Sequence, residues 1–308
     1  MEYPSRVIDR PLQQSMQGCQ FGPANPFVKF KKEEIEQSIP DRFEQVVAKY
    51  PNRLAVKTKN HELTYESLNQ TANCIARAIV ELRGEKAEPT ALLFEQGGPL
   101  IAAILAVLKA GKFYIPLDPS YPRARISYML QDCQTPVILT DTQNLATANE
   151  LSRNGLRVLV TDHIETRLPE QNLRLHLPSE ALAYIFYTSG STGNSKGVVD
   201  NHRNVLHNIM RYTNGLHICM EDRLTLLQSC SFSGSVSSLF GALLNGASVF
   251  PFNPREETPE DLASWLLRQE ITIYHSVPAI FRSFLSGKSR FSKIRLVRLE
   301  GDKASRRD

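Results

Sequence analysis

The feature that most restricts the fold is a regular alternation of two hydrophobic patterns between Thr64 and Leu299. Apolar residues at helical spacing, as over 66–82, alternate with short runs that are mostly apolar, such as TALLF (90–94). Further apolar runs follow at 113–117, 136–140, 157–161, 181–188, 223–228, 247–252, 271–275 and 294–299. Such runs suit strands buried on both faces, and the helices between them are the crossovers that parallel strands require. The sequence therefore predicts an α/β fold with two stacked, doubly wound, mostly parallel sheets flanked by helices.

Local sequence patterns predict the domain boundaries and the ends of several helices. Residues 1–32 lack periodicity and predict an extended leader with little core. We expect the globular part to be 33–308, with two α/β subdomains over 33–175 and 176–308. Two helix starts show capping-box patterns, Gly111 predicts a helix end, and the segments around Lys59 and Asn60 predict a hairpin. The capping pairs are Ser38 with Asp41 and Thr258 with Asp261.

The composition is globular and disfavours several classes of function. The 308 residues are 42% hydrophobic and 22% charged, and the net charge of +4 comes from interspersed acids and bases, so nothing predicts a nucleic-acid partner. The five scattered cysteines contain no C-x-x-C pair and predict neither a disulfide framework nor a metal site. The longest apolar run, 101–108, is too short to cross a membrane. We therefore expect a cytoplasmic protein that binds neither nucleic acid nor membrane.

A loop rich in glycine and hydroxyl side chains follows the apolar run at 181–188. Its glycines allow backbone amides to turn inward, its hydroxyl groups add donors, and its lysine adds a positive charge, which together suit a polyphosphate. The residues concerned are Thr188, Ser189, Gly190, Ser191, Thr192, Gly193, Lys196 and Gly197. The Walker pattern fails because Gly197 follows Lys196, and the loop joins strand to strand. The alternative is a flexible surface turn.

This loop and three further blocks resemble the adenylation domains of nonribosomal peptide synthetases, which are adenylate-forming, AMP-binding enzymes. The blocks are LAYIFYTSGSTGNSKGV (182–198), LTYESLNQTANCIARAI (63–79), LKAGKFYIPLDPSYPRARISYMLQD (108–132) and FSGSVSSLFGALLNGASV (232–249). The resemblance implies that a carboxylic or amino acid attacks the α-phosphate of ATP, giving an acyl-adenylate and pyrophosphate. The acyl group then passes to a phosphopantetheine thiol on a carrier protein or a downstream synthetase module.

The same resemblance assigns roles to individual residues. Thr188 and Lys196 are the implied catalytic pair, and the loop from Thr188 to Gly197 holds the phosphates of ATP, with electrostatic stabilisation as its main contribution. The turn formed by Glu300, Gly301 and Asp302 takes the place of the family's adenine-contacting turn, although its acidic residues replace the usual ones. The implied acid-binding residues are Phe232, Ser233, Gly234, Ser237 and His275.

One of these positions departs from the family pattern. Ser233 stands where the family has the aspartate that binds the α-ammonium of the substrate, and loss of one half of a buried ion pair costs about 3–5 kcal/mol. We therefore expect an acid without an α-amino group, such as a hydroxy, keto, aryl or fatty acid. For His275 the alternative to substrate binding is a ring that only ends a strand.

The family's later motifs fall beyond Asp308. They include an acid that helps to hold Mg²⁺ and the lysine of a small C-terminal subdomain. We therefore expect that subdomain to be absent and this portion to be inactive alone. Two other hypotheses remain open, namely a non-catalytic remnant or interaction module that keeps the fold, and an unrelated phosphate-binding hydrolase.

Overall fold

A computed structural model describes residues 25–152, 155–164, 170–188, 195–285 and 291–303. Its helices are η1 (Lys32–Ile35), α2 (Ile39–Lys49), α3 (Tyr65–Arg83), α4 (Gly98–Lys109), α5 (Arg123–Asp132), α6 (Leu145–Leu151), η2 (Thr161–His163), α7 (His202–Leu216), α8 (Gly234–Leu243), α9 (Pro259–Arg268) and α10 (Pro278–Leu285). Its strands are β1 (Leu54–Lys57), β2 (Glu62–Thr64), β3 (Pro89–Leu93), β4 (Phe113–Leu117), β5 (Val137–Thr140), β6 (Arg157–Val160), β7 (Leu182–Thr188), β8 (Lys196–Asn201), β9 (Arg223–Leu226), β10 (Ser248–Pro251), β11 (Ile273–Ser276) and β12 (Leu296–Leu299).

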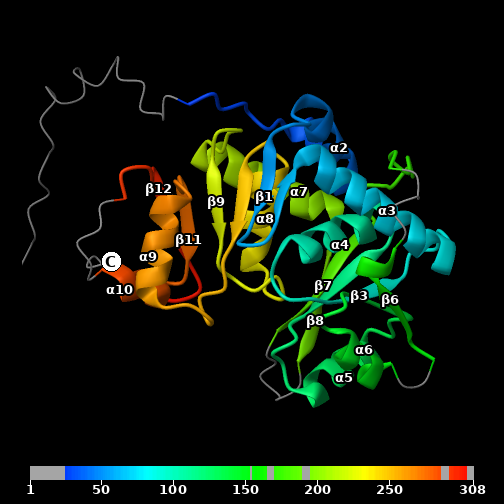
Figure 1. Cartoon of the computed structure of the whole chain (residues 1–308). Coiled ribbons are helices and arrows are strands. Elements are labelled where there is room, and N and C mark those ends of the chain that lie inside the picture. The colour runs from blue at the N-terminus through cyan, green and yellow to red at the C-terminus, as the bar shows by residue number, and fades with distance from the viewer. Residues whose placement is uncertain (1–24, 153–154, 165–169, 189–194, 286–290, 304–308) are drawn as a thin grey trace, which may run out of the picture.

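The strands form two six-stranded sheets (Figure 1). Sheet A has the order β12-β11-β9-β10-β1-β2, and sheet B has the order β6-β5-β3-β4-β7-β8. Neighbouring strands are parallel except for the hairpins β1–β2 and β7–β8, each at one edge of its sheet. The predicted α/β class is therefore confirmed, with two sheets that are mixed because each carries one antiparallel edge strand.

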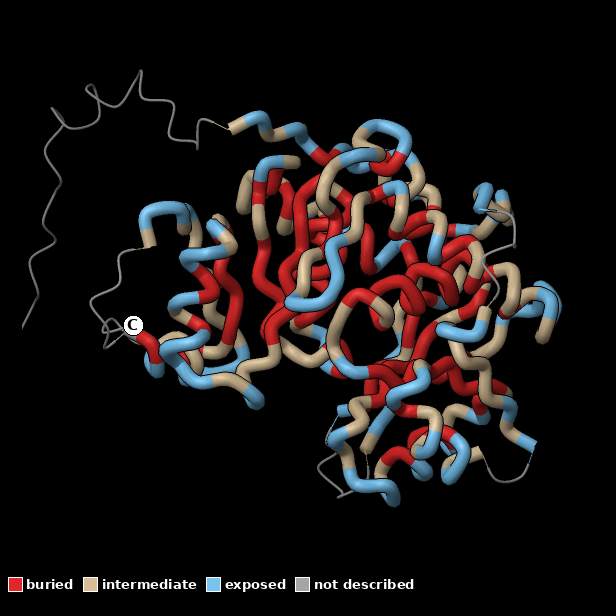
Figure 2. Tube along the Cα trace, in the orientation of Figure 1, coloured by how far each residue is buried: buried red, intermediate tan, exposed pale blue. Residues whose placement is uncertain are grey.

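Three apolar clusters define the layers of the molecule. The largest joins side chains of α2, α3, α4, α7 and α8 to both sheets, and Figure 2 shows the buried segments concentrated there. A second cluster packs α5 and α6 on the outer face of sheet B, and a third packs α9 and α10 on the outer face of sheet A. The order of layers is thus helices, sheet A, helices, sheet B, helices.

Helix α4 lies in the central layer because its sequence leaves it no polar face. Its residues from Gly98 to Lys109 are buried apart from one proline, as expected for a helix that is apolar on every side. Gly111, at a φ of 70°, follows its end as predicted. The buried ammonium of Lys109 pairs with Glu44 of α2, which ties the two helices together. In the described ranges no helix has both the length and the apolarity that a bilayer crossing requires.

The predicted local signals also appear in the structure. In both capping boxes the hydroxyl group accepts a hydrogen bond from the backbone N–H three residues on, at 3.1 Å for Ser38 and 3.2 Å for Thr258. The segments around Lys59 and Asn60 form the β1–β2 hairpin.

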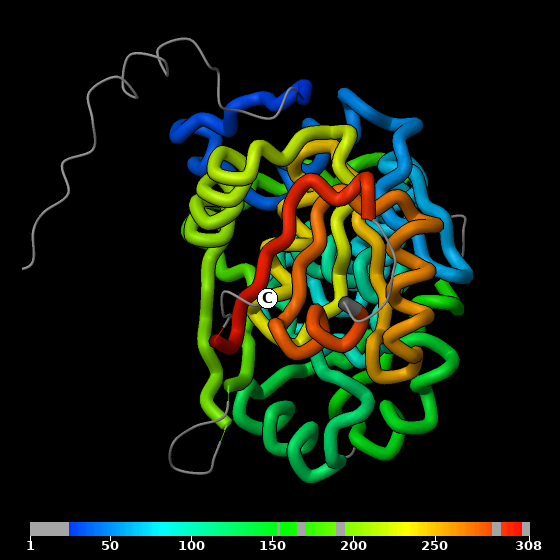
Figure 3. Tube along the Cα trace, turned by 90° about the vertical axis from the view of Figure 1, so that its left-hand side faces the viewer, coloured from blue at the N-terminus to red at the C-terminus, as the bar shows by residue number. Residues whose placement is uncertain are grey.

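The sheets do not divide the chain at residue 175. Sheet B contains the strands from 89 to 160 but also β7 and β8, while sheet A combines the early hairpin β1–β2 with the four strands after 223. Figure 3 shows the late strands of the chain in sheet A, where β10 lies beside β1 and β12 forms the opposite edge. The proposed subdomains 33–175 and 176–308 stay a prediction, and they do not coincide with the sheets.

The segment predicted as a leader contributes to the core at its end. Phe30 is 1% exposed, and its backbone N–H and C=O bond the side chain of Asn214 at 2.9 and 2.8 Å. The guanidinium carbon of Arg42 lies 3.9 Å from the centre of its ring. A single aromatic residue in an aperiodic stretch gives no pattern, so the sequence did not reveal this anchor. Residues 1–24 lie outside the described ranges.

Candidate functional site

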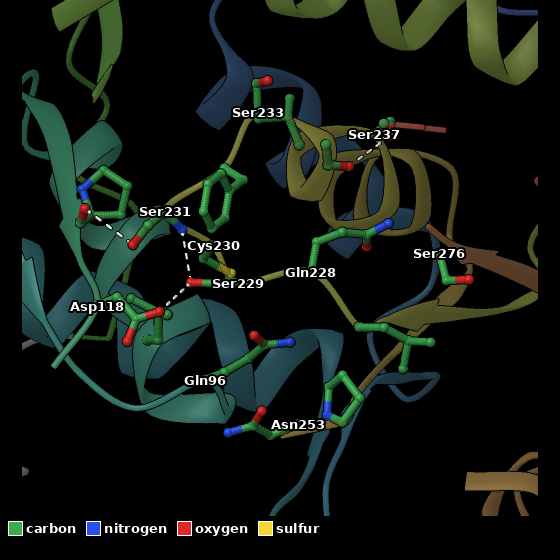
Figure 4. Close-up of a pocket in the computed structure, with 18 of the residues that line it drawn as sticks. Gln96, Asp118, Gln228, Ser229, Cys230, Ser231, Ser233, Ser237, Asn253 and Ser276 are labelled. Carbon is green, nitrogen blue, oxygen red and sulfur yellow. Dashed lines mark hydrogen bonds between the residues drawn. The ribbon is translucent and has the colours of Figure 1, made fainter. Parts of the chain in front are cut away.

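A cavity of about 1150 Å³ opens where the carboxyl ends of strands from both sheets meet. Strands β3 and β4 of sheet B and β9, β10, β11 and β12 of sheet A each contribute residues at or just after their last position. Figure 4 shows Gln96 and Asn253 on one side of this cavity, with Ser233 and Ser237 across from them. Open α/β sheets bind ligands at this edge, so the cavity is the candidate site.

One end of the cavity is formed by a charged cluster on β11, β12 and α8. Arg298 donates to Ser237 Oγ at 2.6 Å, to the hydroxyl group of Tyr212 and to Oε2 of Glu300. Its guanidinium carbon also lies 3.9 Å from the centre of the Tyr212 ring. The side chain of Arg298 is 15% exposed and that of Glu300 is 34% exposed. The carboxylate is therefore the more open member of the ion pair.

His275 lies directly behind this ion pair. It is 2% exposed, and its Nδ1 lies 2.9 Å from Ser238 Oγ. Its Nε2 lies 2.9 Å from Oε1 of Glu300, within ion-pair distance but without the alignment of a hydrogen bond. Burial lowers the pKa of His275 below its ordinary value, with Glu300 acting in the opposite direction. Burial raises the pKa of Glu300, but His275 and Arg298 outweigh it and hold that pKa below its ordinary value. Glu300 is therefore an anion that faces a neutral ring.

Helix α8 begins beside this cluster. A Cβ atom at Gly234 would lie 3.0 Å from Oε1 of Glu300 and 3.8 Å from Cγ of Gln228. Glycine at this position therefore lets the carboxylate approach the start of the helix. Ser237, one turn later, donates to the carbonyl group of Gly234 at 3.0 Å.

The other side of the cavity is acidic. Asp118, just after β4, accepts from Ser120 Oγ at 2.6 Å and from Ser229 Oγ at 3.0 Å, and lies 3.6 Å from Arg255. Burial and the nearby carboxylates, of which Asp118 acts most strongly, raise the pKa of Glu95. Both side chains line the cavity.

Two further wall residues bear on what the cavity can do. Burial raises the pKa of Cys230 to about 12, so its thiol stays protonated and is no nucleophile at neutral pH. Gln228 has both its side-chain oxygen and nitrogen buried without a hydrogen-bond partner in the described part of the chain. Since buried polar atoms are normally paired, this amide is suited to contact a ligand.

The predicted phosphate loop is only partly described. Ser189, Gly190, Ser191, Thr192 and Gly193 lie outside the described residues. Thr188 and Lys196 are register partners at the open end of the β7–β8 hairpin, and both are exposed. Tyr128 of α5 donates to the carbonyl group of Ser195 at 3.1 Å, which holds this end of the hairpin near α5.

Gly197 is required by packing. A Cβ atom there would lie 3.0 Å from Cγ2 of Ile185 and 3.5 Å from the ring of Tyr187. Thr188, Lys196 and Gly197 do not line the cavity described above. Their predicted contact with phosphates therefore depends on the residues between them and stays a prediction.

The structure brings the other predicted groups together. Phe232, Ser233, Gly234 and Ser237 line the cavity with Glu300 and Gly301, whereas Asp302 does not. His275 lies behind that wall. The predicted acid-binding residues and the predicted adenine turn thus share one site.

Sequence reasoning missed three contributors to this wall, namely Gln228, Arg298 and Asp118. Asp118 follows β4 directly and Gln228 lies two residues after the end of β9, so polar residues near the ends of apolar runs were the available signal. Arg298 is one of two arginines in the strand run 294–299, and a charge within a strand run was a second signal.

With this geometry in view, comparison with known proteins identifies the family. A model of the AMP-binding enzyme family matches residues 43–307, and the chain belongs to that family. It is 33% identical over 290 residues to tyrocidine synthase 1 of Brevibacillus parabrevis, across 89% of this chain and 26% of that protein. It is 37% identical over 218 residues to gramicidin S synthase 1 of Brevibacillus brevis, across 70% of this chain and 20% of that protein. The chain thus spans about a quarter or less of these relatives.

Solved structures agree with the fold. The AMPPNP-bound form of the nonribosomal peptide synthetase FmoA3 superposes with a TM-score of 0.81 at 26% identity, over 90% of this chain and 30% of that chain. The N-terminal subdomain of NpsA from Klebsiella oxytoca has a TM-score of 0.78 at 22% identity, over 88% of this chain and 68% of that one, which shows a shared fold. The predicted resemblance to adenylation domains of nonribosomal peptide synthetases is confirmed.

Proposed function

We propose that this chain is the ATP-binding and acid-binding portion of an enzyme that activates a carboxylic or amino acid as its acyl-adenylate, with release of pyrophosphate. The acyl group would then pass to a phosphopantetheine thiol on a carrier protein or a downstream synthetase module. Membership of the AMP-binding family supports this reaction class, and a relative solved in an AMPPNP-bound form supports ATP as the nucleotide.

The observation that carries the proposal is the cavity between the two sheets. Its volume of about 1150 Å³ lies just above the range of small-molecule sites, which is roughly 300–1,000 Å³. An acid and a nucleotide must be bound together for adenylate formation, and a cavity of this size suits two substrates. Its wall also carries the amide of Gln228, which has no hydrogen-bond partner in the described part of the chain and so fits a polar ligand.

Mg²⁺ and the phosphopantetheine thiol are also part of the proposal, but the described residues offer less support for them than for ATP and the acid. No group of three or more histidine, cysteine, aspartate or glutamate side chains suited to a metal ion occurs among the described residues. We therefore assign Mg²⁺ no ligand here and expect its ligand, like the catalytic lysine of the C-terminal subdomain, from another part of the enzyme. As the resemblance implies, we also propose that this portion alone is inactive.

The test is ATP binding by the purified chain, measured by calorimetry, together with Lys196→Ala. We expect the wild-type chain to bind ATP and the variant to bind about tenfold or more weakly, because a charged hydrogen bond to phosphate is lost. Lys29→Ala, at another exposed lysine, is the matched control and should bind like the wild type. We also expect acid-dependent exchange of pyrophosphate into ATP only after fusion to the C-terminal part of an adenylation domain.

A non-catalytic remnant is the second candidate, and the exposure of Lys196 away from the cavity wall favours it. Absence of ATP binding, or equal binding by the wild type and Lys196→Ala, would support this candidate against the enzyme.

A further inference from the structure

The cavity contains a carboxylate close to the place from which the family's aspartate is missing. Oε1 of Glu300 lies 3.0 Å from the Cβ position of Gly234, the residue next to Ser233. The chain thus has no acidic side chain at position 233. Glu300, which follows β12, instead places a carboxylate at the start of the same helix.

The surroundings of Glu300 leave one of its oxygens available. Oε2 is taken by Arg298, whose Nη atoms also donate to Ser237 and Tyr212. Among the described residues no aligned hydrogen bond reaches Oε1, because the ring of His275 is close but badly oriented. A carboxylate oxygen in this state accepts a hydrogen bond from a ligand donor at little cost.

The rest of the cavity favours a positive ligand group. Carboxylates outnumber guanidinium groups among the residues that line it. The acids are Glu95, Asp118, Asp200, Glu256 and Glu300, and the bases are Arg255 and Arg298. The side-chain oxygen of Gln228 is buried without a hydrogen-bond partner among the described residues, and Cγ of Gln228 lies 3.8 Å from the same Gly234 Cβ position. A carboxylate and a side-chain amide that both approach Gly234 offer acceptor oxygens that are suited to an ammonium group.

We propose that the acid activated here carries an amino group, and that Glu300 binds this group with help from Gln228. The inference rests on the proposed function, since it names the substrate class of that site. It differs from the expectation of an acid without an α-amino group, because that expectation considered only position 233. Glu300 and Gln228 come from strand ends distant in sequence, and only the fold brings them to the start of α8.

The experiment compares acids that differ only by the amino group, titrated into the chain by calorimetry in the presence of AMPPNP. The pairs are phenylalanine with 3-phenylpropanoate, leucine with 4-methylpentanoate, β-alanine with propanoate, and 2-aminobenzoate with benzoate. We expect at least one amino acid to bind about tenfold or more tightly than its partner, as a charged hydrogen bond provides. In Glu300→Gln, which keeps the shape of the side chain, that preference should disappear.

Glu256→Gln is the matched control, because it removes the same charge from the wall near Asn253, across the cavity from Ser233 and Ser237. It should keep the preference. An equal loss in both variants would assign the preference to the general charge of the cavity and overturn the role of Glu300. AMPPNP binding and a thermal melt show whether Glu300→Gln is folded, and Gln228→Leu is a second variant that should weaken the preference without altering the ion pair.

The outcomes separate this inference from the proposed function. If AMPPNP binds but the deaminated acids bind as well as their partners, or no acid of the panel binds, the amino-group inference is wrong and acyl activation survives. If neither AMPPNP nor any acid binds, both fail.

Discussion

At the scale of single residues, His202 makes the stability of this protein depend on pH. Its ring is 1% exposed, and Nδ1 accepts a hydrogen bond from the backbone N–H of Ile39 at 3.3 Å. Burial lowers the pKa of His202 from 6.5 to about 4, with Asp41 acting in the opposite direction. Between these two values the unfolded chain binds the extra proton, so stability falls as the pH falls from about 6.5 towards 4.

We expect the free energy of unfolding to decrease by about 2 kcal/mol between pH 7 and pH 5 through this residue alone. Urea titrations of wild type and His202→Asn at both pH values measure it, because asparagine can still accept from Ile39 but cannot titrate. His207→Asn, exposed on the same helix, should retain the wild-type pH difference. A pH difference that is the same in all three proteins would contradict this origin.

Residue types alone predicted much of the candidate site but not its charge. Phe232, Ser233, Gly234 and Ser237 were found because they lie together in one recognisable block. The consequence of Ser233 could not be predicted, because the carboxylate of Glu300 reaches the start of α8 from the end of β12, more than 60 residues later in the chain. No local pattern reveals a contact over such a separation.

At the scale of elements, the turn between α8 and β10 depends on a glycine. Gly246 has a φ of 79°, and a Cβ atom there would lie 2.7 Å from the ring of Tyr50. Gly84, after α3, has a φ of 68° with nothing within 4 Å of its Cβ position. Both positions are strained for alanine, but only the first adds a steric conflict.

We expect Gly84→Ala to cost about 1 kcal/mol of unfolding free energy and Gly246→Ala about 3 kcal/mol or more, because overpacking adds to backbone strain. Urea midpoints of the two variants give the comparison directly. Similar losses of unfolding free energy in both variants would mean that Tyr50, which follows α2, moves aside freely and does not restrict the turn.

Element types followed from the sequence, whereas their order in the sheets did not. The apolar runs and capping boxes predicted most helices and strands because these signals are local. The addition of β1 to β10 depends on contacts between residues such as Val56 and Val249, far apart in the chain, and no local pattern encodes it. Hence the hairpin was predicted correctly but not its place in sheet A.

At the scale of the whole molecule, the central apolar layer predicts that the described fold unfolds as one unit. The largest cluster contains side chains of both sheets. Unfolding of one sheet would therefore expose core side chains of the other, and both should unfold together. The protein offers separate probes for the two sides. Trp265, the single tryptophan of the sequence, is buried on α9 outside sheet A, whereas Ile138 is fully buried in the cluster outside sheet B.

We therefore predict that Ile138→Val, which removes one methyl group and about 1 kcal/mol of stability, shifts the urea midpoint of Trp265 fluorescence as much as that of the far-ultraviolet circular dichroism signal. The substitution lies on the opposite side of the molecule from the fluorophore, so an equal shift requires that both sheets unfold together. If the subdomains 33–175 and 176–308 folded independently, only part of the dichroism transition would move. The fluorescence midpoint would then stay at its wild-type value, because Trp265 would belong to the unaltered unit.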